Sequence, residues 1–158
     1  MLPGLFALLA TACATAPETS LDAATPESAG MVDIRQLVPD IDTDIRYATV
    51  RNFTGSRVDG YEAGKCYLLT PAAQALAEVE HELRSEGLRL QVYDCYRPAR
   101  AVRQFVRWAA DAADQSTKDE YYPALDKSTL VPGYISDRSG HSKCATVDLT
   151  LLDCRQGP

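Results

Sequence analysis

The most regular pattern of apolar and polar positions predicts a helix followed directly by a strand. Residues 70–87 begin with Thr70-Pro71, where a hydroxyl N-cap and a proline favour a helix start, and they end in a glycine. The apolar side chains of this segment fall on one helical face, at Leu76, Val79 and Leu83. Residues 88–92 then alternate between apolar and polar positions, which is the period of a strand with one buried face.

Weaker patterns continue the elements along the chain. A second amphipathic helix is expected over residues 99–113 and a last strand over residues 145–151. Shorter apolar segments predict strands at 32–34 and 45–47. The long segment 116–138 has no regular pattern, which is typical of lids and binding loops.

The start of the chain differs in kind from the rest. Residues 1–13 carry no charge and hold a short apolar run, which predicts an export signal rather than a membrane span. Ala10-Thr11-Ala12-Cys13 resembles a bacterial lipobox, which predicts lipidation of Cys13 and attachment to a membrane; a plain cleaved signal is the alternative. Residues 14–31, rich in Ala, Thr, Pro and Ser, read as a flexible tether. A periplasmic location is therefore expected.

Composition narrows the class of protein only slightly. The 158 residues suffice for one domain, expected over residues 32–158. Apolar residues make up 46% of the chain and charged residues 24%, which are ordinary globular values. The net charge of −6 argues against nucleic-acid binding, because that needs a basic surface. The chemistry must therefore be read from particular residues.

Four cysteines remain when Cys13 is set aside: Cys66, Cys95, Cys144 and Cys154. An oxidising compartment permits them to pair, and three connectivities are open. Cys66 with Cys95 is the first expectation, since both flank the predicted helix–strand unit. The chain has no Cys-x-x-Cys motif, which argues against a zinc site built from cysteines.

Two residues of metal-binding type lie near the end of the chain. His141 precedes Asp148 by seven residues, and imidazole and carboxylate groups are ligands of catalytic zinc. Neighbours on a helix are three or four residues apart, so this spacing needs a turn that leads into a strand. Asp148 then points away from Val147 and Leu149. Spacing alone favours a plain loop histidine and a hydrogen-bonding aspartate.

Arg97 is the second candidate feature. It follows the predicted strand in Tyr96-Arg97-Pro98, and Asp94 lies three residues earlier, where its carboxylate can hold the guanidinium. A fixed arginine beside a metal suits the stabilisation of an oxyanion during amide hydrolysis. The alternative is a surface ion pair of little energetic consequence.

Together these segments resemble a known family. Residues 94–102 (Asp-Cys-Tyr-Arg-Pro-Ala-Arg-Ala-Val), with Ser139-Gly140-His141-Ser142 and Asp148-Leu149-Thr150-Leu151, resemble the zinc D-alanyl-D-alanine dipeptidases of the vancomycin-resistance type, related to D,D-carboxypeptidases and hedgehog-like domains. Further matching blocks are Arg46-Tyr47-Ala48-Thr49, Asn52-Phe53-Thr54-Gly55, Val58-Asp59-Gly60-Tyr61-Glu62 and Lys118-Asp119-Glu120-Tyr121-Tyr122-Pro123. The resemblance implies an α+β fold with a central, mostly antiparallel sheet flanked by helices.

The resemblance also implies the roles of particular residues. His141 and Asp148 correspond to two ligands of one zinc ion, and Arg97 to the arginine that stabilises the tetrahedral intermediate. Residues in or near the dipeptide-binding site are implied at Ser139, Asp94, Tyr47 and Tyr61. Cys144 departs from the family pattern, which has a glycine there; it could pair with Cys154 or simply tolerate the turn.

One part of the family pattern is missing from this sequence. A later Glu-x-x-His-type segment supplies the general base and the third zinc ligand, whereas the only other histidine here is His81, in the middle of the first predicted helix. The resemblance therefore implies that the C-terminal part of the family domain is absent. A chain with two protein ligands is expected to hold zinc weakly and to lack a group that activates water.

The implied function is hydrolysis of the D-Ala-D-Ala dipeptide, by metal-activated water with Arg97 stabilising the oxyanion. The biological setting would be cell-wall turnover or glycopeptide resistance. Two alternatives from other classes stay open: a catalytically inactive fragment, or a module that binds D-Ala peptides without cleaving them. A D,D-carboxypeptidase acting on whole stem peptides is less favoured by the matching blocks.

Overall fold

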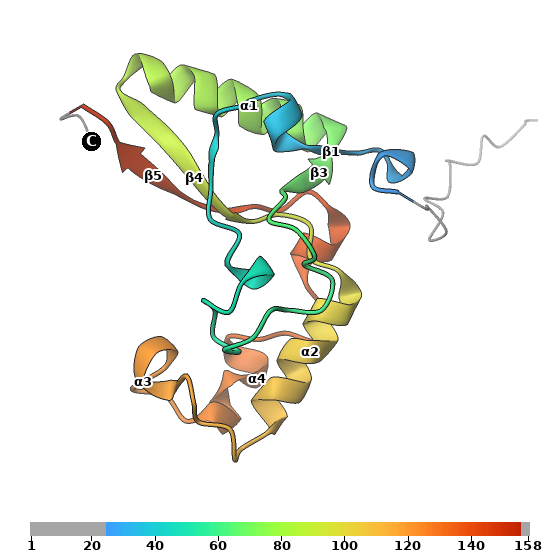
Figure 1. Cartoon of the computed structure of the whole chain (residues 1–158), viewed down its shortest axis with the longest axis vertical. Coiled ribbons are helices and arrows are strands. Elements are labelled where there is room, and N and C mark those ends of the chain that lie inside the picture. The colour runs from blue at the N-terminus through green and yellow to red at the C-terminus, as the bar shows by residue number, and fades with distance from the viewer. Residues whose placement is uncertain (1–24, 156–158) are drawn as a thin grey trace, which may run out of the picture.

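The computed structural model describes residues 25–155, and these form an α+β domain (Figure 1). The helices are α1 (Thr70–Ser85), α2 (Ala99–Ala110), α3 (Lys118–Tyr121) and α4 (Leu130–Gly133). The strands are β1 (Met31–Asp33), β2 (Asp42–Thr43), β3 (Tyr67–Leu69), β4 (Leu88–Asp94) and β5 (Asp148–Asp153). The predicted α+β class is confirmed. The predicted signal and lipid site at Cys13 lie outside the described residues.

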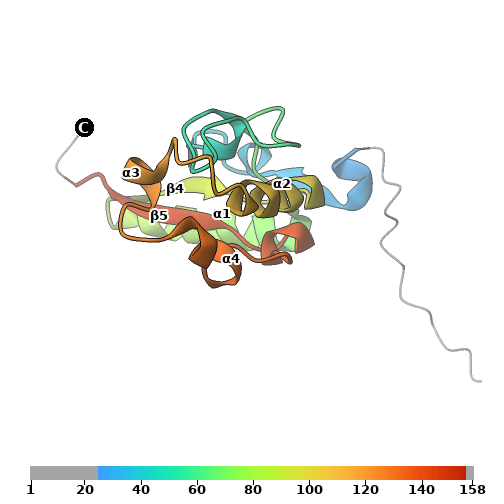
Figure 2. The ribbon, with the colours of Figure 1, turned by 90° about the horizontal axis from the view of Figure 1, so that it is seen from below.

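The strands are divided between two small sheets. β1 and β3 form an antiparallel pair, while β4 is the central strand of the order β2-β4-β5. β4 pairs with β2 in parallel and with β5 antiparallel. Helix α1 lies along β4, and α2 to α4 gather at the other end of the molecule (Figure 1). Seen edge-on, the segment between β2 and β3 lies on one side of β4 and β5, and α4 lies on the other (Figure 2).

Helix α1 is anchored to β4 by a buried carboxylate. The side chain of Glu80 is fully buried, and its Oε2 accepts a hydrogen bond of 2.7 Å from the backbone N–H of Leu90. Its Oε1 accepts from Arg84 at 3.0 Å and from Arg89 at 3.2 Å. A buried carboxylate needs such partners, since unpaired it would lose its hydration without compensation. The network fixes the strand that ends at the candidate site.

The sequence predictions hold for the long elements and fail at some details. The helix at 70–87 forms, but Thr70 is its first residue and makes no capping bond; its Oγ1 donates to Gly30 instead. Val79, expected on the buried face, is 46% exposed. The second helix ends at Ala110 instead of residue 113. The first element among the described residues is a 3-10 helix at Glu27–Ala29, ahead of the expected domain boundary at residue 32.

The predicted strand at 45–47 is wrong. A 3-10 helix occupies Arg46–Ala48, and the nearest strand, β2, lies just before it. The side chain of Asn52 explains the difference, because its Nδ2 donates to the carbonyl oxygens of Arg46 and Thr49 at 3.4 and 2.8 Å. These bonds close a turn in place of a strand ladder. The turn directs the ring of Tyr47 towards Phe105 of α2, with centroids 5.0 Å apart.

The segment 116–138, expected to be irregular, holds the short helices α3 and α4 and a 3-10 turn at Lys127–Thr129. It packs against α2 through a second small core of Trp108, Ala109, Tyr122 and Leu130. Among the described residues, no helix is long and apolar enough to cross a membrane.

Candidate active site

His141 lies in a tight turn whose geometry fixes its ring. The turn is a 3-10 helix over Gly140–Lys143, and the hydroxyl oxygen of Ser139 accepts a hydrogen bond from the His141 backbone N–H. The ring Nδ1 lies 2.8 Å from the carbonyl oxygen of Cys95. A carbonyl only accepts, so Nδ1 carries the proton, and in the neutral imidazole Nε2 keeps its lone pair. This is the arrangement that most metal-binding histidines show.

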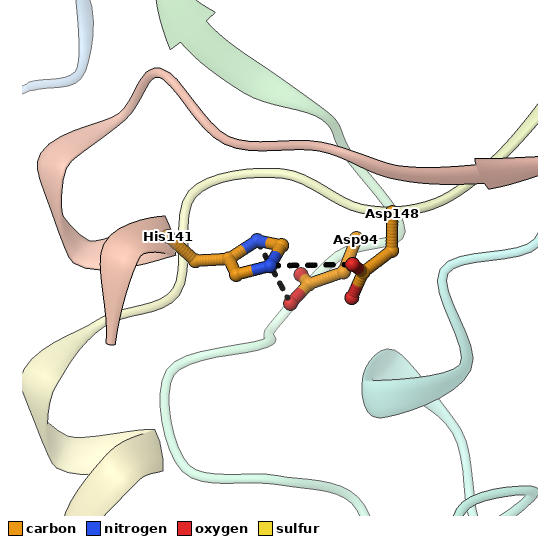
Figure 3. Close-up of side chains that lie close together, drawn as sticks. All are labelled: Asp94, His141 and Asp148. Atoms are coloured by element: carbon orange, nitrogen blue, oxygen red, sulfur yellow. Dashed lines mark ion pairs between the residues drawn. The ribbon is translucent and has the colours of Figure 1, made fainter. Parts of the chain in front are cut away.

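Asp148, the first residue of β5, faces that free nitrogen. Its Oδ1 lies 3.4 Å from Nε2 of His141, and the side chain is 53% exposed (Figure 3). Asp148 raises the pKa of His141, and burial opposes this shift. In turn, the hydrogen bond from His141 lowers the pKa of Asp148. When Nε2 is protonated the two side chains form an ion pair at the surface of a cleft, and when it is not, Nε2 is free to bind a metal.

Asp94 lies close to this pair, but its oxygen atoms are already used. Oδ1 accepts from the hydroxyl of Tyr61 at 2.7 Å and from the backbone N–H of Cys95 at 3.0 Å. Oδ2 accepts from Nε and Nη2 of Arg97 at 3.0 and 2.8 Å. Burial raises the pKa of Asp94, and its charged partner Arg97 opposes this. Asp94 is a buried support for the arginine.

The guanidinium of Arg97 is held between this carboxylate and two aromatic rings. Its Cζ lies 5.4 Å from the ring centroids of both Tyr47 and Phe105. Its Nη1 donates to the hydroxyl oxygen of Ser139 at 3.4 Å, and its side chain is 15% exposed. Burial disfavours the charged form, but Asp94, Tyr47 and Tyr61 together outweigh it and the pKa of Arg97 is raised. A fixed, charged donor group therefore lines the cleft.

The main chain joins Arg97 to the turn that carries His141. The N–H of Arg97 donates to the carbonyl oxygen of His141 at 3.3 Å, and the hydroxyl of Ser142 donates to the carbonyl oxygen of Arg97 at 2.8 Å. Although these segments are far apart in sequence, they form one rigid unit. The relative position of the arginine and the imidazole is thus set by backbone contacts.

The cleft has a volume of about 390 Å³. Its polar wall is formed by Arg97, Ser139, His141 and Asp148, and its apolar wall by Tyr47, Phe53, Val102, Phe105 and Ile135. Tyr134, Ser136 and Arg138, from the end of the segment 116–138, form its rim. A space of this size suits a small molecule or a dipeptide.

His141 and Asp148 fit two positions of a zinc site. Ligand atoms that bind tetrahedral zinc at about 2.0–2.2 Å lie about 3.3–3.5 Å from each other, and Nε2 and Oδ1 are separated by 3.4 Å. Among residues 25–155, Asp94 is the only further His, Cys, Asp or Glu side chain within 4.8 Å of both. Its closer contact to His141 is with Nδ1, the nitrogen turned away from Asp148. The spacing of His141 and Asp148 is therefore that of two zinc ligands, while Asp94 is bonded to Arg97.

A comparison with models of protein families gives one match that covers most of the chain. A family model described as D-ala-D-ala dipeptidase matches residues 27–157. The chain belongs to this family. The family consists of zinc-dependent metallopeptidases, which agrees with the chemistry of His141 and Asp148.

Similar proteins in several bacteria are named D-alanyl-D-alanine dipeptidase. The chain is 39% identical to the protein from Enterococcus faecalis, over 81% of this chain and 64% of that protein. It is 40% identical to the one from Streptomyces coelicolor, over 78% of this chain and 62% of the relative. It is 31% identical to the protein from Escherichia coli, over 78% of this chain and 54% of that protein. The chain thus spans about three-fifths of the length of these dipeptidases.

The structure brings most of the predicted dipeptidase residues together. His141, Asp148, Arg97, Ser139 and Tyr47 line one cleft. Asp94 and Tyr61 lie behind it, both buried, and support Arg97 from the core side. Burial raises the pKa of Tyr47 to about 12, so its phenol stays neutral beside the arginine.

The apolar wall of the cleft is formed by residues that the sequence does not mark as site residues. Phe53 and Phe105 come from segments that are far apart in sequence, and their ring centroids lie 4.8 Å apart with the rings tilted. Phe105 falls within the helix predicted at 99–113, and Phe53 within one matching block, and neither carries a sign of lining a cleft. The available signal was the long segment 116–138, whose end supplies Tyr134 and Ile135.

The four cysteines between residues 25 and 155 divide into a bonded pair and two free thiols. Cys66 and Cys95 form a disulfide, and both are 1% exposed. Within the described chain Cys144 and Cys154 are free, so the structure does not bring this pair together. Cys144 ends the His141 turn in the left-handed conformation, with φ of 60°. A cysteine therefore occupies a backbone position that favours glycine.

Proposed function

We propose that this protein is a zinc metallopeptidase that hydrolyses the D-Ala-D-Ala dipeptide, the activity in the names of its relatives. One observation carries the proposal. The Cys95 carbonyl holds Nδ1 of His141, so that Nε2 faces Asp148 at 3.4 Å in the cleft that Arg97 lines. When bound by His141 and Asp148, zinc would supply Lewis-acid chemistry for activating water and a peptide carbonyl.

Arg97 is proposed to stabilise the negative charge that develops on the carbonyl oxygen. Its Nε and Nη2 are taken by Asp94, and its Nη1 points to the cleft beside Ser139. Because the guanidinium is already fixed and largely shielded from water, it needs no reorganisation when the charge appears. Donors prepared in this way act more strongly on the transition state than on the ground state.

Ser139 is proposed to bind the substrate through its hydroxyl proton. Its oxygen accepts hydrogen bonds from Arg97 and from the His141 backbone N–H. The O–H is therefore left to donate to an acceptor in the cleft, such as an oxygen of the dipeptide. The volume of about 390 Å³ favours a dipeptide over a longer stem peptide.

A second candidate function is binding of D-Ala peptides without hydrolysis. It is favoured by one observation: among the described residues, the side chains that line the cleft include no glutamate, and Asp148 is the only carboxylate. A general base and a third ligand would therefore have to come from elsewhere in the protein. Release of D-alanine distinguishes the two functions, since both predict binding of the dipeptide.

We also propose that the protein is exported and acts in cell-wall turnover or glycopeptide resistance. The buried Cys66–Cys95 disulfide supports export, because disulfides form and persist in oxidising compartments. Lipidation of Cys13 remains part of this proposal. Mass spectrometry of the protein from a bacterial membrane fraction tests it, and an unmodified Cys13 in that fraction would contradict it.

The proposed activity is tested by zinc titration and by D-alanine release. Purified protein is titrated with zinc by calorimetry and then given D-Ala-D-Ala. His141→Ala is expected to abolish zinc binding and product release together. His81→Ala is the matched control, since His81 is exposed on α1 and outside the cleft. If His141→Ala binds zinc as tightly as the unchanged protein, the metal assignment is wrong. If the protein binds D-Ala-D-Ala but releases no D-alanine, its function is binding of D-Ala peptides without hydrolysis.

A further inference from the structure

The disulfide lies directly beside the residue that orients His141. Cys95 carries both the sulfur bonded to Cys66 and the carbonyl oxygen that receives Nδ1 of His141 at 2.8 Å. We propose that the Cys66–Cys95 disulfide is a positioning device for the site: it fixes the Cys95 carbonyl and, through it, the tautomer and direction of the His141 imidazole.

The imidazole depends strongly on this one acceptor. Within the described residues, the Cys95 carbonyl is the hydrogen-bond partner of Nδ1, and the next polar atom is Oδ2 of Asp94 at 3.6 Å. That oxygen already receives two hydrogen bonds from Arg97. A displaced Cys95 carbonyl would therefore leave Nδ1 without a comparable partner, and the proton could move to Nε2.

The sheet by itself gives Cys95 little support. The ladder between β4 and β5 becomes irregular between Val92 and Asp94, and its last pair is Asp94 with Asp148. Cys95 lies just beyond this end. Its own N–H bonds to the side chain of Asp94 and to no neighbouring strand. The carbonyl that orients His141 thus lies where strand pairing stops.

The disulfide adds a covalent contact to the other sheet, beside one backbone hydrogen bond. Cys66 directly precedes β3, and its carbonyl oxygen accepts from the N–H of Ile34 at 3.0 Å. The next residues along, Tyr67 and Tyr96, are joined by a backbone hydrogen bond of 3.0 Å. Cys66 belongs to the side of the two-stranded sheet, and Cys95 to the side of the three-stranded sheet. The bond therefore fastens the end of β4 to the other sheet.

The position of the bond explains why it would act locally. Both cysteines are 1% exposed, so the neighbouring side chains hold them in one arrangement. The rest of β4 is independently anchored by Glu80 through the N–H of Leu90. Loss of the disulfide is thus expected to free the Cys95–Arg97 segment more than the strand. The zinc-binding purpose rests on the proposed function, whereas the positioning of the ring does not.

The test reads the tautomer directly, in metal-free protein. Long-range nitrogen–hydrogen NMR of the imidazoles at alkaline pH distinguishes Nδ1–H from Nε2–H. The chain has only two histidines, so exposed His81 serves as an internal reference. The variant is the double substitution Cys66→Ala with Cys95→Ala, and the control is Cys154→Ser, which removes an exposed free thiol.

In the unchanged protein and in the control, His141 is expected to show one tautomer with Nδ1 protonated. In the double variant its two nitrogen shifts should move towards the averaged values of His81. Exchange of the Arg97 amide hydrogen, which donates to His141, should become at least about tenfold faster. Zinc affinity should fall about 10- to 100-fold, as for other lost supports of ligating histidines.

Two results would overturn the proposal. One is a folded double variant whose His141 keeps the shifts of the unchanged protein. The other is a double variant that does not fold by circular dichroism, since the disulfide would then be a general stabiliser of the domain. If neither the unchanged protein nor the double variant binds zinc, the proposed metallopeptidase function fails. The tautomer of His141 in the two proteins still decides whether the disulfide positions the ring.

Discussion

One carboxylate oxygen of Asp94 receives both Nε and Nη2 of Arg97, at 3.0 and 2.8 Å. The other oxygen receives the Tyr61 hydroxyl and the Cys95 amide. The acceptor positions of this buried carboxylate are thus filled by groups that support the site. Asp94 holds the arginine in place, and in the proposed zinc site His141 and Asp148 are the groups left to bind the metal.

The substitution Asp94→Asn tests this supporting role. It keeps the shape but removes the charge, and the amide cannot accept two bonds from Arg97 as strongly. We expect kcat/KM for D-Ala-D-Ala to fall about 10- to 100-fold, mainly through kcat. Asp59→Asn, in an exposed ion pair with Arg107, is the control and should change nothing. Unchanged kinetics in a folded Asp94→Asn protein would remove Asp94 from its assigned role.

Arg97→Ala tests the oxyanion role more directly. Loss of a prepared donor is expected to lower kcat by about 100- to 1000-fold, with a smaller effect on dipeptide affinity measured by calorimetry. Arg100→Ala removes an exposed arginine of the same helix region and is the matched control. If affinity and kcat/KM fall by the same factor and kcat is unchanged, Arg97 binds the substrate without acting on the transition state.

The helix at 70–87 and the strand after it could be predicted because short stretches of sequence are enough to encode them. The helix at 70–87 and the following strand are encoded by periodicity within a few residues, and Gly87 ends the helix with φ of 72°. Val79 fits the helical pattern yet lies exposed, because the buried side is chosen by where β4 packs. A pattern gives a helical face, whereas the tertiary contacts select which residues are covered.

The candidate site could be predicted in its side chains, with Asp94 as the support of Arg97, but not in its backbone contacts. His141, Asp148 and Arg97 follow from matching blocks of sequence. The hydrogen bond between the Cys95 carbonyl and His141 does not follow from the sequence, because every residue type has the same backbone carbonyl. The strand predicted at 45–47 failed for a related reason: the side chain of Asn52 closes a turn there. Side-chain bonds to the main chain override weak apolar patterns.

The buried network of Glu80 predicts a large effect on stability. Glu80→Gln removes the charge that Arg84 and Arg89 share, while Leu90 keeps an acceptor. Both arginines are about one-third exposed, so water compensates part of the loss. We expect the free energy of unfolding to fall by about 2–3 kcal/mol, measured by urea denaturation. Glu82→Gln, exposed on the same helix, should stay within about 0.5 kcal/mol. An equal effect of both changes would mean that the network adds nothing.

Cys144 carries backbone strain that glycine should relieve. Its φ of 60° and ψ of 20° place it in the left-handed region, which costs a residue with a side chain about 1–2 kcal/mol. Glycine avoids this cost but loses more entropy on folding, by about 0.5–1 kcal/mol. Cys144→Gly is therefore expected to raise the free energy of unfolding by about 0.5–1 kcal/mol. Cys154→Gly is the control: Cys144 is the only non-glycine residue with positive φ between residues 25 and 155, so glycine at 154 should bring no gain. Thermal and urea unfolding of the two variants check this, and a less stable Cys144→Gly protein would show that the thiol contributes more than the strain removes.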